Sequence, residues 1–172
     1  MTSQLRVDKI VPVDGVPSGG GGGIVQIVQS VKTDTFTSSA NSTWTDITGM
    51  TVSITPKFSS SKILISVIMG ISNGSDELHV LRLLRGSTPI GASTGGTYNG
   101  FAIMDSEAIG GTRSRYIGHV KAEILDSPST TSATTYKVQF WKNGGNSMHV
   151  NRRALNDASQ YSSTITAYEV SA

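Results

Sequence analysis

The sequence contains no cysteine and is poor in aromatic and charged residues. Without cysteine, the chain has no disulfide, no cysteine-ligated zinc or iron–sulfur centre and no thiol nucleophile. Charged residues make up only 15% of the chain, and so low a share disfavours a coiled coil or a long helical bundle. The longest apolar run, residues 63–71, is interrupted by Ser66 and Gly70 and is too short to span a bilayer. We therefore expect no membrane contact.

The charge balance does not favour nucleic-acid binding. The 14 lysines and arginines stand against 12 aspartates and glutamates, which gives a formal net charge of +2. The basic residues are scattered and no four of them are consecutive, whereas a protein that follows a phosphate backbone needs a basic patch or stripe. We expect no nucleic-acid partner.

Small polar residues are abundant instead. The chain contains 25 serines, 19 threonines and 19 glycines. Hydrophobic residues still make up 37% of its 172 residues, which is enough to fill the core of one domain and argues against disorder. The supply of Thr, Val and Ile suits the pleated surface of a β-sheet.

From residue 24 onward the dominant pattern is an alternation of apolar and polar residues, which predicts β-strands. In segment 134–142, for example, Tyr136, Val138 and Phe140 share one face, and Lys137, Gln139 and Trp141 share the other. Segment 61–72 is more continuously apolar, as in a strand that is buried on both faces. Clusters of Gly, Asn, Asp, Ser and Pro between the segments predict turns.

Eight to ten such strands without a convincing helix favour an all-β domain over residues 24–172. The predicted architecture is a two-sheet antiparallel sandwich, jelly-roll-like, with an extended N-terminal arm. An immunoglobulin-like sandwich is the alternative, since many members of that architecture lack the usual Cys–Trp–Cys core.

Residues 1–23 differ from the rest of the chain. A semi-alternating apolar segment is interrupted by two prolines and followed by a run of glycines, which has no side chain to pack and great conformational freedom. We interpret it as an anchoring arm and a hinge, with the arm held by neighbouring chains as an added strand. The anchoring positions are Leu5, Val7, Ile10 and Val11, and the hinge consists of Gly19, Gly20, Gly21, Gly22 and Gly23.

No motif makes a convincing case for catalysis, a cofactor or a metal. Residues 70–74 match the G-x-S-x-G pattern around Ser72, but that elbow needs a strand before it and a helix after it. The three histidines, His79, His119 and His149, form no spaced pair of metal ligands. We predict a non-enzymatic protein without cofactor or metal. A hydrolase that uses Ser72 as its nucleophile is kept as a third hypothesis, after the two that are given below.

Several phrases distributed over most of the chain carry a family resemblance: LRVDKIVP, the Gly-rich hinge, IVQIVQSVKTDTFT, GMTVSITPKFSSSKILISV, LLRGSTPIG, LDSPSTTSATTYKVQF and VNRR. They resemble the small virion proteins of tailed bacteriophages, especially marine and cyanobacterial phages. Members of that family are variously labelled tail fibre, head fibre or virion structural protein. The resemblance therefore implies a particle component, a homotrimer with a β-sandwich head, and leaves its position on the particle open.

The first hypothesis for function is a structural protein on the particle exterior. The chain would be made in the host cytoplasm and assembled onto other virion proteins, of the capsid or of a tail platform, through arm residues 1–18. We expect capsid decoration or a short fibre, because 172 residues leave no room for a long shaft. Residues 73–76, 91–100 and 105–113 depart most from the phrases quoted above, and loops of this kind are where host contacts would lie.

The alternative is a receptor-binding module, part of a tail fibre, that recognises host surface glycans. Aromatic side chains stack on sugar rings, so this hypothesis predicts that aromatic residues gather in an exposed groove. The candidates are Tyr98, Trp141 and Tyr161.

Overall fold

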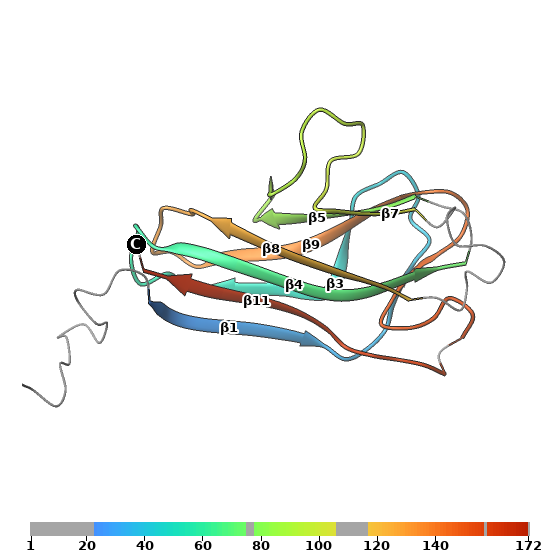
Figure 1. Ribbon diagram of the computed structural model, residues 1–172, viewed down its shortest axis with the longest axis horizontal. Coiled ribbons are helices and arrows are strands. Elements are labelled where there is room, and N and C mark those ends of the chain that lie inside the picture. The colour runs from blue at the N-terminus through green and yellow to red at the C-terminus, as the bar shows by residue number, and fades with distance from the viewer. Residues whose placement is uncertain (1–22, 75–77, 106–116, 157, 172) are drawn as a thin grey trace, which may run out of the picture.

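The chain folds into two antiparallel β-sheets that pack face to face (Figure 1). The structure is a computed structural model that describes residues 23–74, 78–105, 117–156 and 158–171. These residues contain eleven strands: β1 (Ile24–Lys32), β2 (Phe36–Ser38), β3 (Thr45–Ile54), β4 (Lys62–Asn73), β5 (Leu78–Arg85), β6 (Thr88–Ile90), β7 (Ala102–Asp105), β8 (Gly118–Asp126), β9 (Thr134–Asn143), β10 (Met148–Val150) and β11 (Ser163–Val170). No helix in the described part of the chain is long and apolar enough to cross a membrane.

The strand order is that of a jelly roll. One sheet, called here the β4 sheet, runs β1-β11-β4-β8, and the short strands β10 and β2 extend it beside the end of β4. The other, called the β9 sheet, runs β3-β9-β5, with β6 and β7 on the far edge of β5. The pairs β1–β11, β3–β9, β4–β8 and β5–β7 are nested within one another along the chain, as in a long hairpin rolled into two sheets. The predicted sandwich is confirmed, and this order decides against the immunoglobulin alternative.

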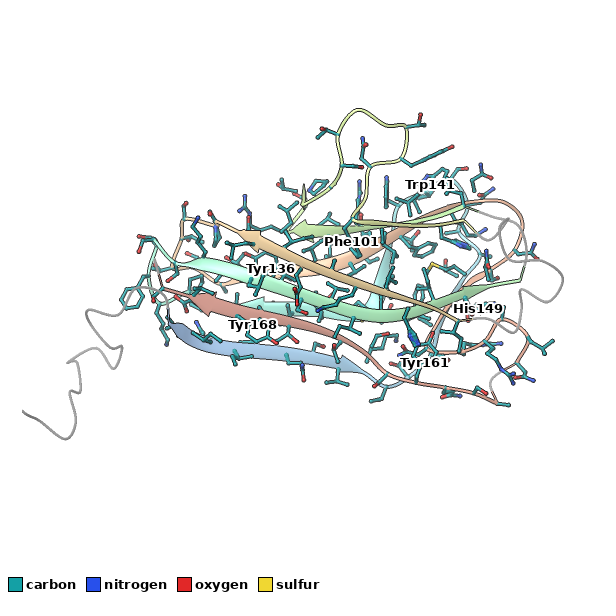
Figure 2. All side chains as sticks on the ribbon, viewed as in Figure 1. Phe101, Tyr136, Trp141, His149, Tyr161 and Tyr168 are labelled. Atoms are coloured by element: carbon teal, nitrogen blue, oxygen red, sulfur yellow. The ribbon has the colours of Figure 1, made fainter. Side chains whose placement is uncertain are left out.

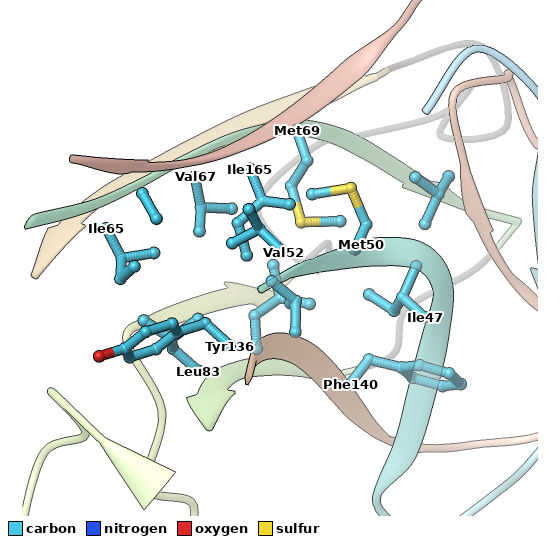
Figure 3. Close-up of a cluster of buried hydrophobic side chains, with 14 of the residues drawn as sticks. Ile47, Met50, Val52, Ile65, Val67, Met69, Leu83, Tyr136, Phe140 and Ile165 are labelled. Atoms are coloured by element: carbon cyan, nitrogen blue, oxygen red, sulfur yellow. The ribbon is translucent and has the colours of Figure 1, made fainter. Parts of the chain in front are cut away.

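The core lies between the two sheets (Figure 3). Because successive side chains of a strand point to opposite faces, every second residue of β4, β11, β3 and β9 enters it. The β4 sheet contributes Ile65, Val67, Met69 and Ile165, and the β9 sheet contributes Met50, Val52, Leu83, Tyr136 and Phe140; all of them are buried. The predicted inward face of segment 134–142 is confirmed.

The expectation that segment 61–72 is buried on both faces is only half correct. The outward-facing residues near its end, Gly70 and Ser72, are buried. Of those before them, Leu64 and Ser66 are half-buried and Ile68 is exposed. The reason is that no other described part of this chain covers the outer face of the β4 sheet at this point.

A polar contact ties the two sheets together at the edge of the core. The Tyr136 hydroxyl of β9 donates to Oδ2 of Asp126 at 2.7 Å, and Nη1 of Arg85 in β5 donates to both oxygens of the same carboxylate. Burial, followed by the hydrogen bond to Asp126, raises the pKa of the Tyr136 hydroxyl well above its usual value. The phenol therefore stays protonated and remains a donor that links β9 to β8.

A second buried polar group, Glu169 in β11, organises the end of the sandwich where the described chain begins and ends. Its carboxylate accepts hydrogen bonds from the backbone N–H groups of Lys57 and Phe58 and from the side chain of Gln26. Burial alone raises the pKa of Glu169, but these hydrogen bonds outweigh it and hold the pKa below its usual range. The ionised carboxylate thus joins β11, β1 and the β3–β4 connection.

We predict that Glu169→Gln lowers the free energy of unfolding by about 2 kcal/mol at neutral pH, because it weakens hydrogen bonds to a buried charge. Since the folded-state pKa is depressed, the stabilisation is fully present above the unfolded-state pKa and is lost as pH falls through the folded-state value. The difference between wild type and variant should therefore shrink in acid. Denaturant unfolding at a series of pH values measures it.

Glu123→Gln is the matched control, since Glu123 is exposed and pairs with Lys121 at the surface. An exposed pair contributes little, so this variant should unfold nearly like the wild type at every pH. A Glu169→Gln variant whose stability deficit is the same at neutral and acidic pH would contradict the assignment.

Candidate functional site

Two of the three aromatic candidates meet on the outside of the β9 sheet. The rings of Tyr98 and Trp141 are 4.5 Å apart between centroids, with their planes tilted by 35°. Trp141 projects outward from β9 beside Val80 of β5, and Tyr98 lies in the loop between β6 and β7. Both are half-buried, so the pair is accessible from one side. Figure 2 shows Trp141 at the edge of the sandwich.

Gly100 brings the loop this close to the sheet. A Cβ atom at Gly100 would lie 2.3 Å from the carbonyl oxygen of Leu81 and 2.6 Å from a methyl carbon of Val80. The next residue, Phe101, donates its backbone N–H to the same carbonyl at 2.8 Å. Only a residue without a side chain permits this approach, and it seats the loop that presents Tyr98.

A polar network with a further aromatic ring extends from this pair across the same face. The guanidinium of Arg82 lies 3.9 Å from the ring centroid of Trp44, within range of a cation–π interaction. Its Nε and Nη2 donate to Oε1 of Gln139, and Nε2 of Gln139 donates to Asp46 at 2.6 Å. Nζ of Lys137 lies 2.7 Å from the other oxygen of Asp46. The network holds its side chains in place before any ligand arrives.

Asp46 stays ionised in this network. Partial burial raises the pKa of its carboxyl, but hydrogen bonds from Lys137 and Gln139, together with the positive charges of Lys137 and Arg82, outweigh that effect and lower the pKa below its usual value. The face therefore offers aromatic surfaces, amide groups and balanced charges. These groups suit recognition of a polar ring-shaped ligand.

Part of this face could be found from the sequence. The alternation in segment 134–142 places Lys137, Gln139 and Trp141 together, and the structure confirms that they share the outer face. Arg82 and Asp46 join them only through strand pairing between distant segments. Nothing in the local pattern signals that pairing.

Tyr161, the third candidate, lies elsewhere. It stacks on His119 at 5.6 Å on the outer side of the β4 sheet, far from Trp141 in Figure 2. A Cβ at Gly70 would fall 2.1 Å from a Tyr161 ring carbon, so the ring fills the space that Gly70 leaves. Its hydroxyl is buried without a hydrogen-bond partner among the described residues, and burial raises its pKa. Tyr161 is therefore a packing residue and does not join the Tyr98–Trp141 pair.

Ser72 is not placed as a nucleophile. It lies inside β4, paired with His149 of β10, and not at a strand-to-helix turn. Its side chain is buried, and its hydroxyl donates to the backbone oxygen of Arg152 at 2.7 Å. His149 instead faces the hydroxyl of Thr37 at 3.0 Å. The G-x-S-x-G match is therefore a strand segment, which removes the basis of the hydrolase hypothesis.

The described residues include no group of three or more His, Asp or Glu side chains that could hold a metal ion. The three histidines lie apart: His79 is buried beside Asn73, His119 stacks on Tyr161, and His149 contacts Thr37. The anchoring positions Leu5, Val7, Ile10 and Val11 lie outside the described residues, as does the hinge except for Gly23.

No known protein family and no characterised protein matches the chain in sequence. Among solved structures, the chain is distantly similar to the VP2 protein of infectious bursal disease virus. A VP2 mutant in T=1 particles has 12% identity and a TM-score of 0.43, over 98% of this chain and 40% of that one. The Gx strain structure gives 12% and 0.40, and a VP2 subviral particle gives 12% and 0.37. The chain thus spans about two fifths of the length of these proteins, and its fold assignment rests on its own strand order.

Proposed function

We propose that this chain is a non-enzymatic structural protein on the exterior of a tailed bacteriophage particle. It would serve there, as a homotrimer, in capsid decoration or as a short fibre, anchored to other virion proteins by its N-terminal arm. The observation that carries the proposal is that the two ends of the sandwich differ. The chain enters at one end, and the aromatic pair and several connections between strands lie at the other.

The entry end is tied down by backbone contacts. Gly23 donates its N–H to the Ser171 hydroxyl at 2.9 Å, and its carbonyl accepts from the N–H of Ser171 at 3.0 Å. The first and last described residues of the sandwich therefore meet, next to the Glu169 cluster described above. The arm that precedes Gly23 starts from a point that is held firmly in the fold.

At the opposite end of the sandwich, the last residues of β4, β7 and β9 lie beside the first residues of β5, β8 and β10. The pairing register places these residues together, because Leu78 pairs with both Asp105 and Asn143, and Ile71 pairs with Gly118. Trp141 is only two residues from Asn143. An arm at one end and loops with an aromatic pair at the other suit a protein that is attached by its base and presents its tip.

The pairing of β1 can resist a force that is applied through the arm. β1 runs antiparallel to β11 over eight paired positions, from Ile24 to Lys32. A pull along the axis of β1 would have to shear these hydrogen bonds together and could not open them one at a time. This geometry supports anchoring through the arm.

Removal of residues 1–18 should abolish attachment to the particle and leave the sandwich folded, because residues between 28 and 167 supply the core between the two sheets. Particles of the encoding phage assembled without this protein are mixed with the full chain or the truncated chain, and bound protein is measured after sedimentation. The full chain should bind saturably, and the truncated chain should not. Circular dichroism checks that the truncated chain is folded.

A full-length variant with Leu5→Ser, Val7→Ser, Ile10→Ser and Val11→Ser keeps the length of the arm and removes its apolar side chains. It should bind particles as poorly as the truncated chain if these side chains are the anchors. Undiminished binding by the truncated chain would disprove anchoring through the arm.

A receptor-binding role is the second candidate, and the Tyr98–Trp141 pair favours it. Two half-buried rings in contact, with Trp44 and its Arg82 partner further along the face, provide stacking surfaces beside fixed hydrogen-bonding groups. Host surface glycans have the complementary chemistry of apolar ring faces and hydroxyl groups.

If the chain binds host glycans, Trp141→Ala should weaken binding by about tenfold or more, the equivalent of about 1.4 kcal/mol, because it removes the central ring of the pair. Tyr161→Phe should bind like the wild type, since the Tyr161 hydroxyl is buried on the other sheet. A glycan array identifies a ligand, and titration calorimetry measures both variants. Equal loss in both variants, or no ligand on the array, would count against this role.

A further inference from the structure

One outer face of the sandwich is unusually apolar. Six large hydrophobic side chains of the described residues are at least half exposed: Ile24, Ile27, Val31, Ile68, Leu125 and Leu155. The first five lie on the outer face of the β4 sheet, as the strand register shows. Single exposed hydrophobic residues are normal on a protein surface, but their concentration on one face marks an interaction site.

The register aligns these side chains into rows across the sheet. Ile27 of β1 pairs with Tyr168 of β11, which pairs with Leu64 of β4, which pairs with Leu125 of β8. This row is apolar across all four strands. A parallel row, Val31–Thr164–Ile68–Lys121, contains the two exposed aliphatic residues Val31 and Ile68, and the row between them, Gln29–Thr166–Ser66–Glu123, is polar. The β4 outer face therefore combines exposed aliphatic side chains with polar ones.

The opposite outer face of the molecule is polar, as expected of a surface in contact with water. There the β9 sheet exposes the network of Arg82, Gln139, Asp46 and Lys137, whose polar groups pair with one another. The two outer faces are built from the same fold and differ in composition. The near-continuous apolar pattern of segment 61–72 is typical of a strand with both faces covered, yet in a single chain Ile68 is left open.

We propose that the β4 outer face is the contact surface between copies of this chain. Its charged residues on β8, Lys121 and Glu123, have opposite signs and form an ion pair with each other at 3.0 Å, so their charges are balanced within each copy. The other charged residue, Lys62, lies at the end of the face, in the row of Val170. The open part of the face, residues 62–68 of β4 with their partners on three neighbouring strands, measures about 23 Å by 19 Å in plan. This plan area is roughly half of the 800 Å² per partner of a standard protein interface, and the corrugation of the side chains adds to it.

The N-terminal arm of the same chain is too narrow to cover the β4 outer face. A single extended segment adds about 5 Å of width to a sheet, which is a fraction of the four strands that present apolar side chains. Other copies of the chain offer a face of matching width. The inference rests on the proposed function only for the expectation that several copies assemble together.

The mass of the full chain in solution, measured by light scattering over a wide range of concentration, tests the proposal. Wild type should form a defined oligomer. Ile68→Glu should raise its dissociation constant about tenfold or more, because the interface would then bury an unpaired charge. Leu155→Glu is the matched control: Leu155 and Ile68 are both 50% exposed, and only Ile68 lies on the β4 outer face.

Leu125→Glu on β8 repeats the test at an outer strand, so that a folding defect of Ile68→Glu, visible by circular dichroism, leaves the proposal decidable. A wild type that stays monomeric at every concentration would overturn it, as would an oligomer that survives both substitutions on the face. Dissociation caused by Leu5→Ser, Val7→Ser and Ile10→Ser alone would make the arm an intersubunit clamp and would also overturn it. No particle is needed, so failure here is distinguishable from failure of particle attachment.

Discussion

β4 is hydrogen-bonded to β11 along one edge and to β8 along the other, and its last residues pair with β10. Its inward side chains, from Ile63 to Ile71, supply the centre of the core. Because the side-chain period of a strand is two, a slip of one residue in this register would turn the core side chains to the surface. The jelly-roll order, the position of β8 opposite Tyr136, and the composition of the outer face all depend on this pairing.

Because the side chains of β4 alternate between two faces, the strand also has an outer face that the described part of the chain covers incompletely. A sandwich has four sheet faces, and only two of them meet in the core. On the β9 sheet the chain covers its outer face partly with the β6–β7 loop, which buries Val80, and partly with paired charges. On the β4 sheet Tyr161 covers the face over Gly70, while the part from Leu64 to Ile68 remains open and carries exposed aliphatic side chains. This difference in packing is the basis of the proposal that copies of the chain assemble through the β4 outer face.

Local patterns predict the strands well and the site poorly. The alternation around Tyr136 and the turn residues at 126–129 and 143–146 are sufficient to place strands, faces and connections. They cannot show that Asp46 reaches Gln139, because that contact depends on which strands pair and in what register. Likewise the aromatic character of Tyr98 and Tyr161 is the same in the sequence, yet Gly100 seats the first beside Trp141 and Gly70 admits the second as packing. The arm, residues 1–18, stays a prediction.

The sandwich separates three kinds of contact in space. Its strands run along the long axis (Figure 1), so the end at Gly23, the end at Trp141 and the β4 outer face point in different directions. Attachment through the arm would leave the aromatic pair and the apolar face accessible, and contact between copies through that face would leave both ends free. The polar clusters that stabilise the ends are also distinct, since Glu169 holds the entry end and the Arg82 network lies on the other sheet. A substitution at the Trp141 end would therefore leave the Glu169 cluster at the entry end intact, and this separation suits the proposed attachment at one end and recognition at the other.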